Sequence, residues 1–180
     1  MGSLSDSDPA IKHSEISYTT RDGHKNRVKL YQPTNPPSSG SPMIMMIHGG
    51  GFCMGGPEGD DQTCRNFVHA FGATCISIAY RLAPEFPFPS GPNDCWDALQ
   101  WAAKNAKSWG ADTSAGFVVG GTSSGGNLAA IVAHLARDEK LSPPLTGQYL
   151  AIPTLVGRGK MPEKYQKYYF SYEQNKGKAT

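Results

Sequence analysis

The sequence predicts an α/β fold in which helices cover both faces of a mostly parallel β-sheet. Short runs of residues are continuously apolar, which is typical of strands that are buried on both faces. Segments with the apolar spacing of amphipathic helices separate these runs, and strands that alternate with helices in this way form parallel βαβ units. The four predicted core strands are residues 42–48, 73–80, 115–121 and 148–155.

Three segments are expected to precede the first of these four strands. Residues 1–14 contain Ser, Asp and Pro without periodicity, so we interpret them as a mobile N-terminal arm. Residues 15–20 and 27–32 resemble strands and flank Asp22-Gly23, which predicts an antiparallel hairpin. A linker rich in Pro, Ser and Gly, residues 33–42, then leads into the first core strand.

Three helices are predicted between and after the core strands, and they cover residues 60–71, 92–109 and 126–140. Pro92 suits a first helical turn and Gly110 a helix end. The core is expected to span residues 15–156. Residues 157–180 are polar and aromatic, and they are expected to form a helical segment that starts a cap or the next core unit. Its aromatic stripe is expected to pack on another surface, and it consists of Tyr165, Tyr168, Tyr169 and Tyr172.

Composition excludes several classes of function. The chain of 180 residues fits one domain, and its net charge of +2 is too small to indicate nucleic-acid binding. No apolar run approaches the roughly 20 residues of a membrane span, and residues 1–10 do not resemble a secretory signal. A cytoplasmic protein without metal or organic cofactor is therefore expected. The cysteines form no Cys-x-x-Cys pair, and they stand at positions 53, 64, 75 and 95.

The first motif is Gly121-Thr122-Ser123-Ser124-Gly125, which follows a predicted strand and precedes a predicted helix. This is the Gly-x-Ser-x-Gly pattern of a sharp turn that exposes a nucleophilic serine. The two glycines allow the strand and the helix to approach each other closely. A phosphate-binding loop is excluded because the required Gly and Lys spacing is missing. A purely structural turn remains an alternative.

The second motif is His48-Gly49-Gly50-Gly51-Phe52, directly after the first core strand. Successive glycines are unfavourable in a purely structural loop, but they allow backbone N–H groups to point at a ligand. We predict that the N–H groups of Gly50, Gly51 and Ser124 form an oxyanion hole. We interpret His48 as an anchor of this loop and not as a catalytic base.

A third motif completes a resemblance to a known family. Residues 80–85 read Tyr-Arg-Leu-Ala-Pro-Glu, and together with the two glycine-rich motifs they resemble the hormone-sensitive-lipase-like branch of the α/β-hydrolases. That branch includes carboxylesterases and arylacetamide deacetylase-like enzymes. The resemblance implies an α/β-hydrolase fold with Ser123 as the nucleophile of ester hydrolysis. Thr122 and Ser124 depart from the commonest family residues, Asp and Ala. Tyr80–Glu85 is expected to brace the nucleophile loop.

The acid and the base of a catalytic triad are not found in the sequence. In this family they follow the serine, yet His134 is the one later histidine, about 16 Å further along the same helix. The last strands of the family's eight-stranded sheet are also not found. Three explanations stay open: the chain is the front part of a serine esterase, a second chain supplies the acid and base, or the chain is a non-hydrolytic relative. Such a relative would act as a small-molecule binding module or as an enzyme of another kind.

The substrate is expected to be a small neutral ester. An apolar pocket for it could form from Phe52, Met54 and Phe86, which lie in or just after two of the motifs. Loop support is expected from Gly49, Gly121 and Gly125. Assembly into a homo-oligomer remains open.

Overall fold

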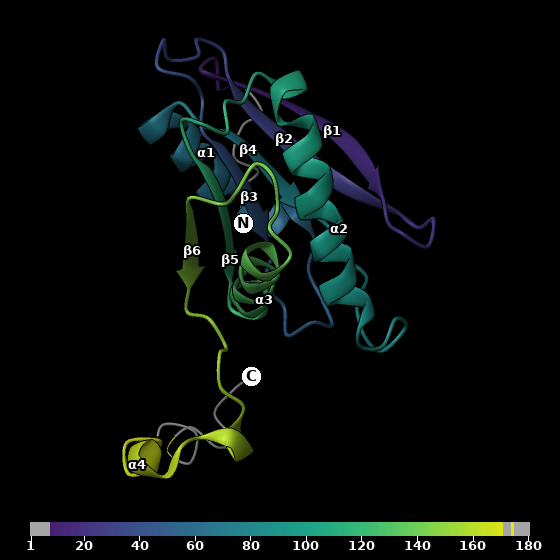
Figure 1. Cartoon of the computed structure of the whole chain (residues 1–180), viewed down its shortest axis with the longest axis vertical. Coiled ribbons are helices and arrows are strands. Elements are labelled where there is room, and N and C mark those ends of the chain that lie inside the picture. Colours follow the sequence, from purple (N-terminus) through teal and green to yellow (C-terminus); the bar gives the residue numbers. More distant parts are fainter. Residues whose placement is uncertain (1–7, 171–173, 175–180) are drawn as a thin grey trace.

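One six-stranded sheet organises the computed structural model, which describes residues 8–170 and Gln174. The strand order is β1-β2-β4-β3-β5-β6 (Figure 1). This confirms the α/β fold and the division into a hairpin and four central strands. The strands are β1 (Ile11–Thr19), β2 (Lys25–Pro33), β3 (Met43–Ile47), β4 (Thr74–Ile78), β5 (Phe117–Thr122) and β6 (Gly147–Ala151).

Parallel and antiparallel pairing divide the sheet into two parts. The hairpin strands β1 and β2 pair antiparallel, and β2 pairs antiparallel with β4. The four central strands are parallel to one another. Ile47 at the end of β3 is in register with both Ile78 and Gly121. The carboxyl ends of β4, β3 and β5 therefore lie side by side, where sites form in open α/β sheets.

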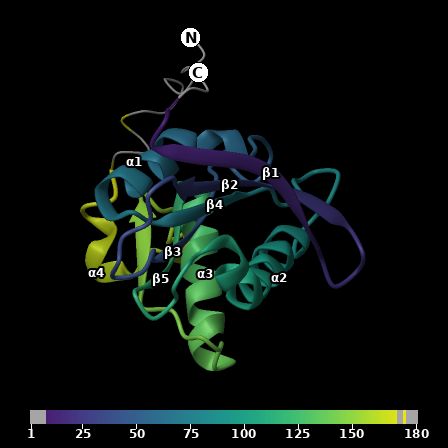
Figure 2. The same cartoon turned by 90° about the horizontal axis from the view of Figure 1, so that it is seen from above.

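Helices cover both faces of the sheet. Figure 2 shows α1 on one face and α2 with α3 on the other. Gly72 has the left-handed φ of 59° that ends α1, and Gly110 ends the 3-10 turn after α2 in the same way. The helices are η1 (Pro57–Asp60), α1 (Asp61–Phe71), α2 (Ser90–Asn105), η2 (Ala106–Trp109), α3 (Ser124–Asp138), η3 (Arg158–Lys160) and α4 (Glu163–Gln166).

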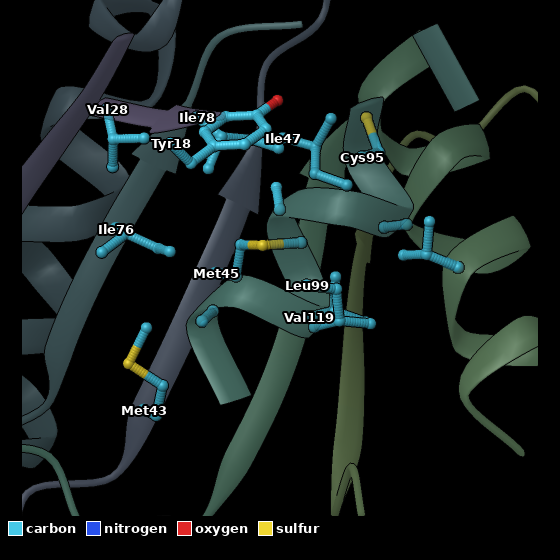
Figure 3. Close-up of a cluster of buried hydrophobic side chains, with 14 of the residues drawn as sticks. Tyr18, Val28, Met43, Met45, Ile47, Ile76, Ile78, Cys95, Leu99 and Val119 are labelled. Carbon is cyan, nitrogen blue, oxygen red and sulfur yellow. The ribbon is translucent and has the colours of Figure 1, made fainter. Parts of the chain in front are cut away.

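Strand β3 supplies side chains to a core on each face, which explains why its sequence is continuously apolar. Met43, Met45 and Ile47 face α2 and α3 (Figure 3), whereas Ile44 and Met46 face α1. Each of these side chains is buried. Burial of a side chain of this size contributes roughly 1.5–3 kcal/mol.

The chain ends differ from the sequence prediction. Strand β1 begins at Ile11, so residues 11–14 pair with β2 and do not belong to an arm. Ile11 is buried in the core on the α1 face, which explains why the strand starts early. Residues 1–7 lie outside the described part.

The aromatic segment after β6 is largely not helical. Helix α4 has four residues, all exposed, and it lies away from the sheet in Figure 1. Tyr165, Tyr168 and Tyr169 are also exposed, so the expected packing of the stripe does not occur among the described residues. Tyr172 lies outside them. In the part of the chain that the structure describes, no helix is long and apolar enough to cross a membrane.

Candidate active site

Ser123 occupies a strained turn between β5 and α3. Its φ of 56° and ψ of −116° are unusual for a residue with a side chain. Such a conformation costs on the order of 1–3 kcal/mol and is typical of functional sites. Glycines make the turn possible. A Cβ atom on Gly125 would overlap the carbonyl oxygen of Ile47, and one on Gly121 would overlap the backbone of Gly125.

The glycine loop after β3 lies against this turn. A Cβ atom on Gly49 would lie 3.5 Å from the Cβ of Ser123 and 2.9 Å from the carbonyl oxygen of Thr122. Gly50 and Gly51 have φ values of 125° and 61°, which favour glycine. The structure thus brings together the two motifs, which are more than 70 residues apart in the sequence.

The three N–H groups that the sequence assigned to an oxyanion hole are free to bind a ligand. Within residues 8–170, no hydrogen bond engages the N–H of Gly50, Gly51 or Ser124. Ser124 opens α3, and the positive end of a helix dipole favours negative charge there. An oxyanion hole at this place stays a prediction.

His48 is enclosed by the same loop. Its Nδ1 donates a hydrogen bond to the carbonyl oxygen of Gly49 at 2.7 Å, and its ring stacks on Tyr80 with 4.4 Å between centroids. Burial lowers the pKa of His48, so the ring is neutral near pH 7. A buried ring in this position holds the loop in place.

Tyr80 and Arg81, the first residues of the third motif, brace the loop from the side of α2. The Tyr80 hydroxyl donates to the carbonyl oxygen of His48 at 3.2 Å, and burial raises the pKa of Tyr80 to about 12, so the hydroxyl stays protonated. The next residue, Arg81, pairs with the fully buried Asp94 of α2 at 2.7 Å. Asp94 also accepts a hydrogen bond from the side chain of Asn26 in the hairpin.

Asp60 is a buried carboxyl group that the sequence did not indicate. Its Oδ1 accepts a hydrogen bond from the hydroxyl of Thr122 at 3.1 Å, directly before Ser123. Its Oδ2 is buried without a partner among the described residues. Burial raises the pKa of Asp60. No local pattern could reveal this contact, because 62 residues separate its partners.

Two of the three predicted pocket residues line one cavity. Phe52 and Phe86 face it together with the start of α3. Met54 is 67% exposed and is not among the residues that line this cavity, so its place in a substrate pocket stays a prediction. Its N–H donates a hydrogen bond to the carbonyl oxygen of Gly50 in a tight turn.

No histidine in the described part of the chain makes a hydrogen bond with Ser123. His13 lies on β1, His24 in the hairpin loop and His69 on α1, where it pairs with Asp8. His134 lies on α3, three helical turns from the serine. Among the same residues, no cluster of His, Cys, Asp or Glu could hold a metal ion.

Comparison with known proteins identifies the family. A family described as "alpha/beta hydrolase fold" matches residues 44–177. "AB hydrolase superfamily protein B1A11.02" of Schizosaccharomyces pombe is 36% identical over 164 residues, which cover 91% of this chain and 48% of that protein. "Carboxylesterase NlhH" of Mycobacterium tuberculosis is 44% identical over 123 residues, which cover 67% of this chain and 37% of that protein. The chain thus spans about half or less of the length of these curated relatives.

Solved structures show the same similarity. Vibralactone cyclase matches with a TM-score of 0.84 and 35% identity, over 95% of this chain and 51% of that one. Bacterial heroin esterase matches with a TM-score of 0.75 and 37% identity, over 83% of this chain and 47% of that one.

Proposed function

Because this chain belongs to the alpha/beta hydrolase fold family, we propose that it carries the nucleophile and the oxyanion hole of a serine carboxylic-ester hydrolase. The observation that carries this proposal is the contact between the strained turn at Ser123 and the glycine loop at Gly49. The relatives include the carboxylesterase described above and an ethyl acetate hydrolase of Pseudomonas putida. Their names support a small neutral ester as the substrate.

The reaction follows from the groups at the site. The Ser123 hydroxyl attacks the ester carbonyl, and its proton passes to a base. The carbonyl oxygen becomes negatively charged and accepts hydrogen bonds from the N–H groups of Gly50, Gly51 and Ser124. The alcohol leaves, and water then hydrolyses the acyl-enzyme. Loss of one such donor typically raises the barrier by about 3–4 kcal/mol.

The base and its acid are not among the groups that the structure places near Ser123. We therefore propose that a further segment or a second chain supplies them, and that residues 1–180 alone turn over ester slowly. His48 is excluded as the base in this proposal, because its ring is buried and its Nδ1 is bound to Gly49.

A second candidate is supported by the similarity to a cyclase. In this alternative the acyl group on Ser123 passes to a hydroxyl of the same molecule and not to water, so the product is a ring. Mass spectrometry of the products distinguishes the two, because hydrolysis adds one water molecule to the products and cyclisation does not.

Labelling with a fluorophosphonate tests the proposal. The test uses the protein together with the segment or second chain that supplies the base. In that protein, the probe should modify the wild type and should not modify Ser123→Ala. Ser108→Ala is a matched control, because Ser108 lies in η2 on the surface. Ser124→Ala should also be labelled, since only its backbone N–H takes part. Equal labelling of the wild type and Ser123→Ala would show that another residue is the nucleophile.

A further inference from the structure

Asp60 occupies the usual position of a helix cap without capping its helix. It is the N-cap residue of α1, where an aspartate side chain normally accepts a hydrogen bond from a backbone N–H of the first turn. No such bond forms here. The carboxyl group instead contacts Thr122, whose hydroxyl donates to its Oδ1 at 3.1 Å. Asp60 therefore forgoes a helix cap and contacts the residue directly before Ser123.

This placement of Asp60 is unfavourable for stability. The residue is 3% exposed, and its Oδ2 has no hydrogen-bond partner among the described residues. Burial of a carboxyl group with incomplete hydrogen bonding costs free energy, and it raises the pKa of Asp60. The hydrogen bond from Thr122 offsets part of that cost. Natural proteins retain such unfavourable local choices mainly at functional sites. The position of Asp60 therefore indicates a role in function rather than in stability.

The neighbouring Asp61 has the opposite character. Its carboxylate pairs with Arg65 at 2.8 Å and with Lys29 at 3.7 Å, and it accepts a hydrogen bond from the Tyr31 hydroxyl at 2.7 Å. These partners belong to α1 and β2, not to the nucleophile turn. Two adjacent aspartates thus hold different parts of the fold: Asp61 joins α1 to β2, whereas Asp60 reaches the nucleophile turn.

A second set of contacts holds the backbone of Ser123 from the side of β6. The Ser123 N–H donates to the carbonyl oxygen of Ala151 at 2.9 Å, and the N–H of Thr154 donates to the Ser123 carbonyl oxygen at 3.4 Å. The side-chain amide of Asn127 fixes this segment, since it donates to the Thr154 carbonyl oxygen at 2.7 Å. These contacts fix the N–H and the C=O of Ser123, but they do not hold the residue before it.

The turn needs support on both sides because its conformation is strained. Ser123 has a left-handed φ of 56°, and strained conformations persist only where surrounding contacts impose them. A displacement of about 1 Å at a reacting group lowers the rate by up to about 10²-fold. We propose that Asp60 is a positioning residue, which holds the turn through Thr122 and so keeps the Ser123 hydroxyl directed at the substrate. Its effect on the reaction rests on the proposed function, whereas its effect on the shape of the turn does not.

Steady-state kinetics of ester hydrolysis test the inference in the protein together with the segment or second chain that supplies the base. Asp60→Ala should lower kcat by about tenfold or more and change KM less than threefold, because the substrate contacts remain. Thr122→Val keeps the shape of the side chain without its hydroxyl and should lower kcat by a similar factor. The double variant should be no more than threefold slower than Asp60→Ala, since both substitutions remove the same bond. Asp60→Asn should keep kcat within threefold of the wild type, because its amide oxygen still accepts the bond.

Asp61→Ala is the matched control, because it removes the adjacent carboxylate. It should lower the midpoint of urea unfolding more than Asp60→Ala does, since it loses three partners, and it should leave kcat within twofold of the wild type. One substitution thus affects mainly stability and the other mainly the reaction rate. If Asp61→Ala lowers kcat as much as Asp60→Ala does, the effect is structural and the inference is wrong. Equal kcat for the wild type and Asp60→Ala would also overturn it.

NMR of the isotope-labelled chain separates this inference from the proposed function. The Cα and Cβ chemical shifts of Ser123 report its backbone conformation independently of any reaction. They should change in Asp60→Ala and Thr122→Val, and they should match the wild type in Asp60→Asn and Asp61→Ala. If they do so and a fluorophosphonate does not label Ser123, Asp60 holds the turn and the esterase proposal fails. If Ser123 is labelled and its shifts stay unchanged in Asp60→Ala, the esterase proposal stands and the inference is wrong.

Discussion

Asp60 and Thr122 show how single residues set the turn that carries the nucleophile. In the family that the sequence resembles, the residue before the serine is most often Asp. Here that position is Thr122, whose hydroxyl donates a hydrogen bond to the carboxyl group of Asp60. The hydrogen bond joins the start of α1 to the end of β5, directly before Ser123. The turn is thereby tied to the opposite face of the sheet.

The raised pKa of Asp60 makes a specific prediction for stability. Because the native pKa lies above the ordinary value of 3.8, the native state binds a proton more tightly than the unfolded state. The wild type should therefore lose stability, relative to Asp60→Asn, as the pH rises from about 4 through the native pKa. Above that pKa the difference should stay constant, because the buried carboxylate is then fully ionised.

Urea unfolding of both proteins between pH 4 and pH 8 measures this difference. Other groups titrate alike in the two proteins, so their contributions cancel. The nearby Tyr80 and Cys64 stay neutral over this range, since burial raises the pKa of each. Each unit of pKa shift corresponds to about 1.4 kcal/mol. A difference that does not change with pH would show that Asp60 ionises as it would in water.

Residues of the site differ in how far the sequence could predict them. Ser123 and the glycines on both loops lie in continuous motifs. The sharp turn and the close approach of the backbone require these residue types at this spacing. Asp94 gave a weaker signal, because it lies four residues before the buried Ala98, on the apolar face of α2. Asp60 gave no signal, because its role depends on a hydrogen bond to Thr122, which lies 62 residues away in the sequence and is brought near only by the fold.

At the level of elements, α2 holds the third motif through a buried ion pair. Arg81 pairs with Asp94, whose side chain is fully buried, whereas Arg21 pairs with Asp97 one turn later and is 51% exposed. Arg81→Ala should lower the free energy of unfolding by about 3–5 kcal/mol, because it leaves a buried carboxylate without its partner. Arg21→Ala should lower it by about 1 kcal/mol or less.

Thermal and urea unfolding of these two variants measure the effect, and Arg21→Ala serves as the matched control. The two arginines each pair with a carboxylate of the same helix, but Arg81 is 11% exposed and also pairs with Asp22, whereas Arg21 is 51% exposed and its partner Asp97 is 9% exposed. Arg81→Ala should also weaken the contact of Tyr80 with His48, which the crosspeak between their rings reports in NMR. Equal losses of stability in both variants would show that burial of the Arg81–Asp94 pair does not determine how much the pair stabilises the protein.

The elements themselves were predicted where a hydrophobic pattern determines them. Strands β3 and β4 are fully buried, and their apolar runs gave their positions within three residues. The segment after β6 was predicted less well, because a short amphipathic helix is stable only when it packs on another surface. Helix α4 and the tyrosines beside it meet no such surface among the described residues.

At the scale of the whole molecule, the strand order decides which loops meet. The sequence predicted six strands, but their order depends on pairings between distant segments and was not predicted. Placing β3 between β4 and β5 brings the glycine loop, the third motif and the nucleophile turn to one edge. Strand β6 ends the sheet with Tyr149 partly exposed, and Ile152 after it is 79% exposed.

The arrangement of the whole chain also predicts its activity in isolation. The chain of residues 1–180 should hydrolyse p-nitrophenyl acetate slowly, because no described histidine can accept the Ser123 proton. Loss of the base from a Ser-His-Asp triad lowers kcat by about 10⁶-fold, although the oxyanion hole and substrate binding retain about 10³–10⁴-fold over water.

His134→Ala should leave the remaining rate unchanged, since His134 lies about 16 Å along α3. Gly50→Ala should lower that rate, because a Cβ would overlap the Met54 carbonyl and displace a predicted oxyanion donor. Rapid hydrolysis that His134→Ala abolishes would mean that the chain contains its own base.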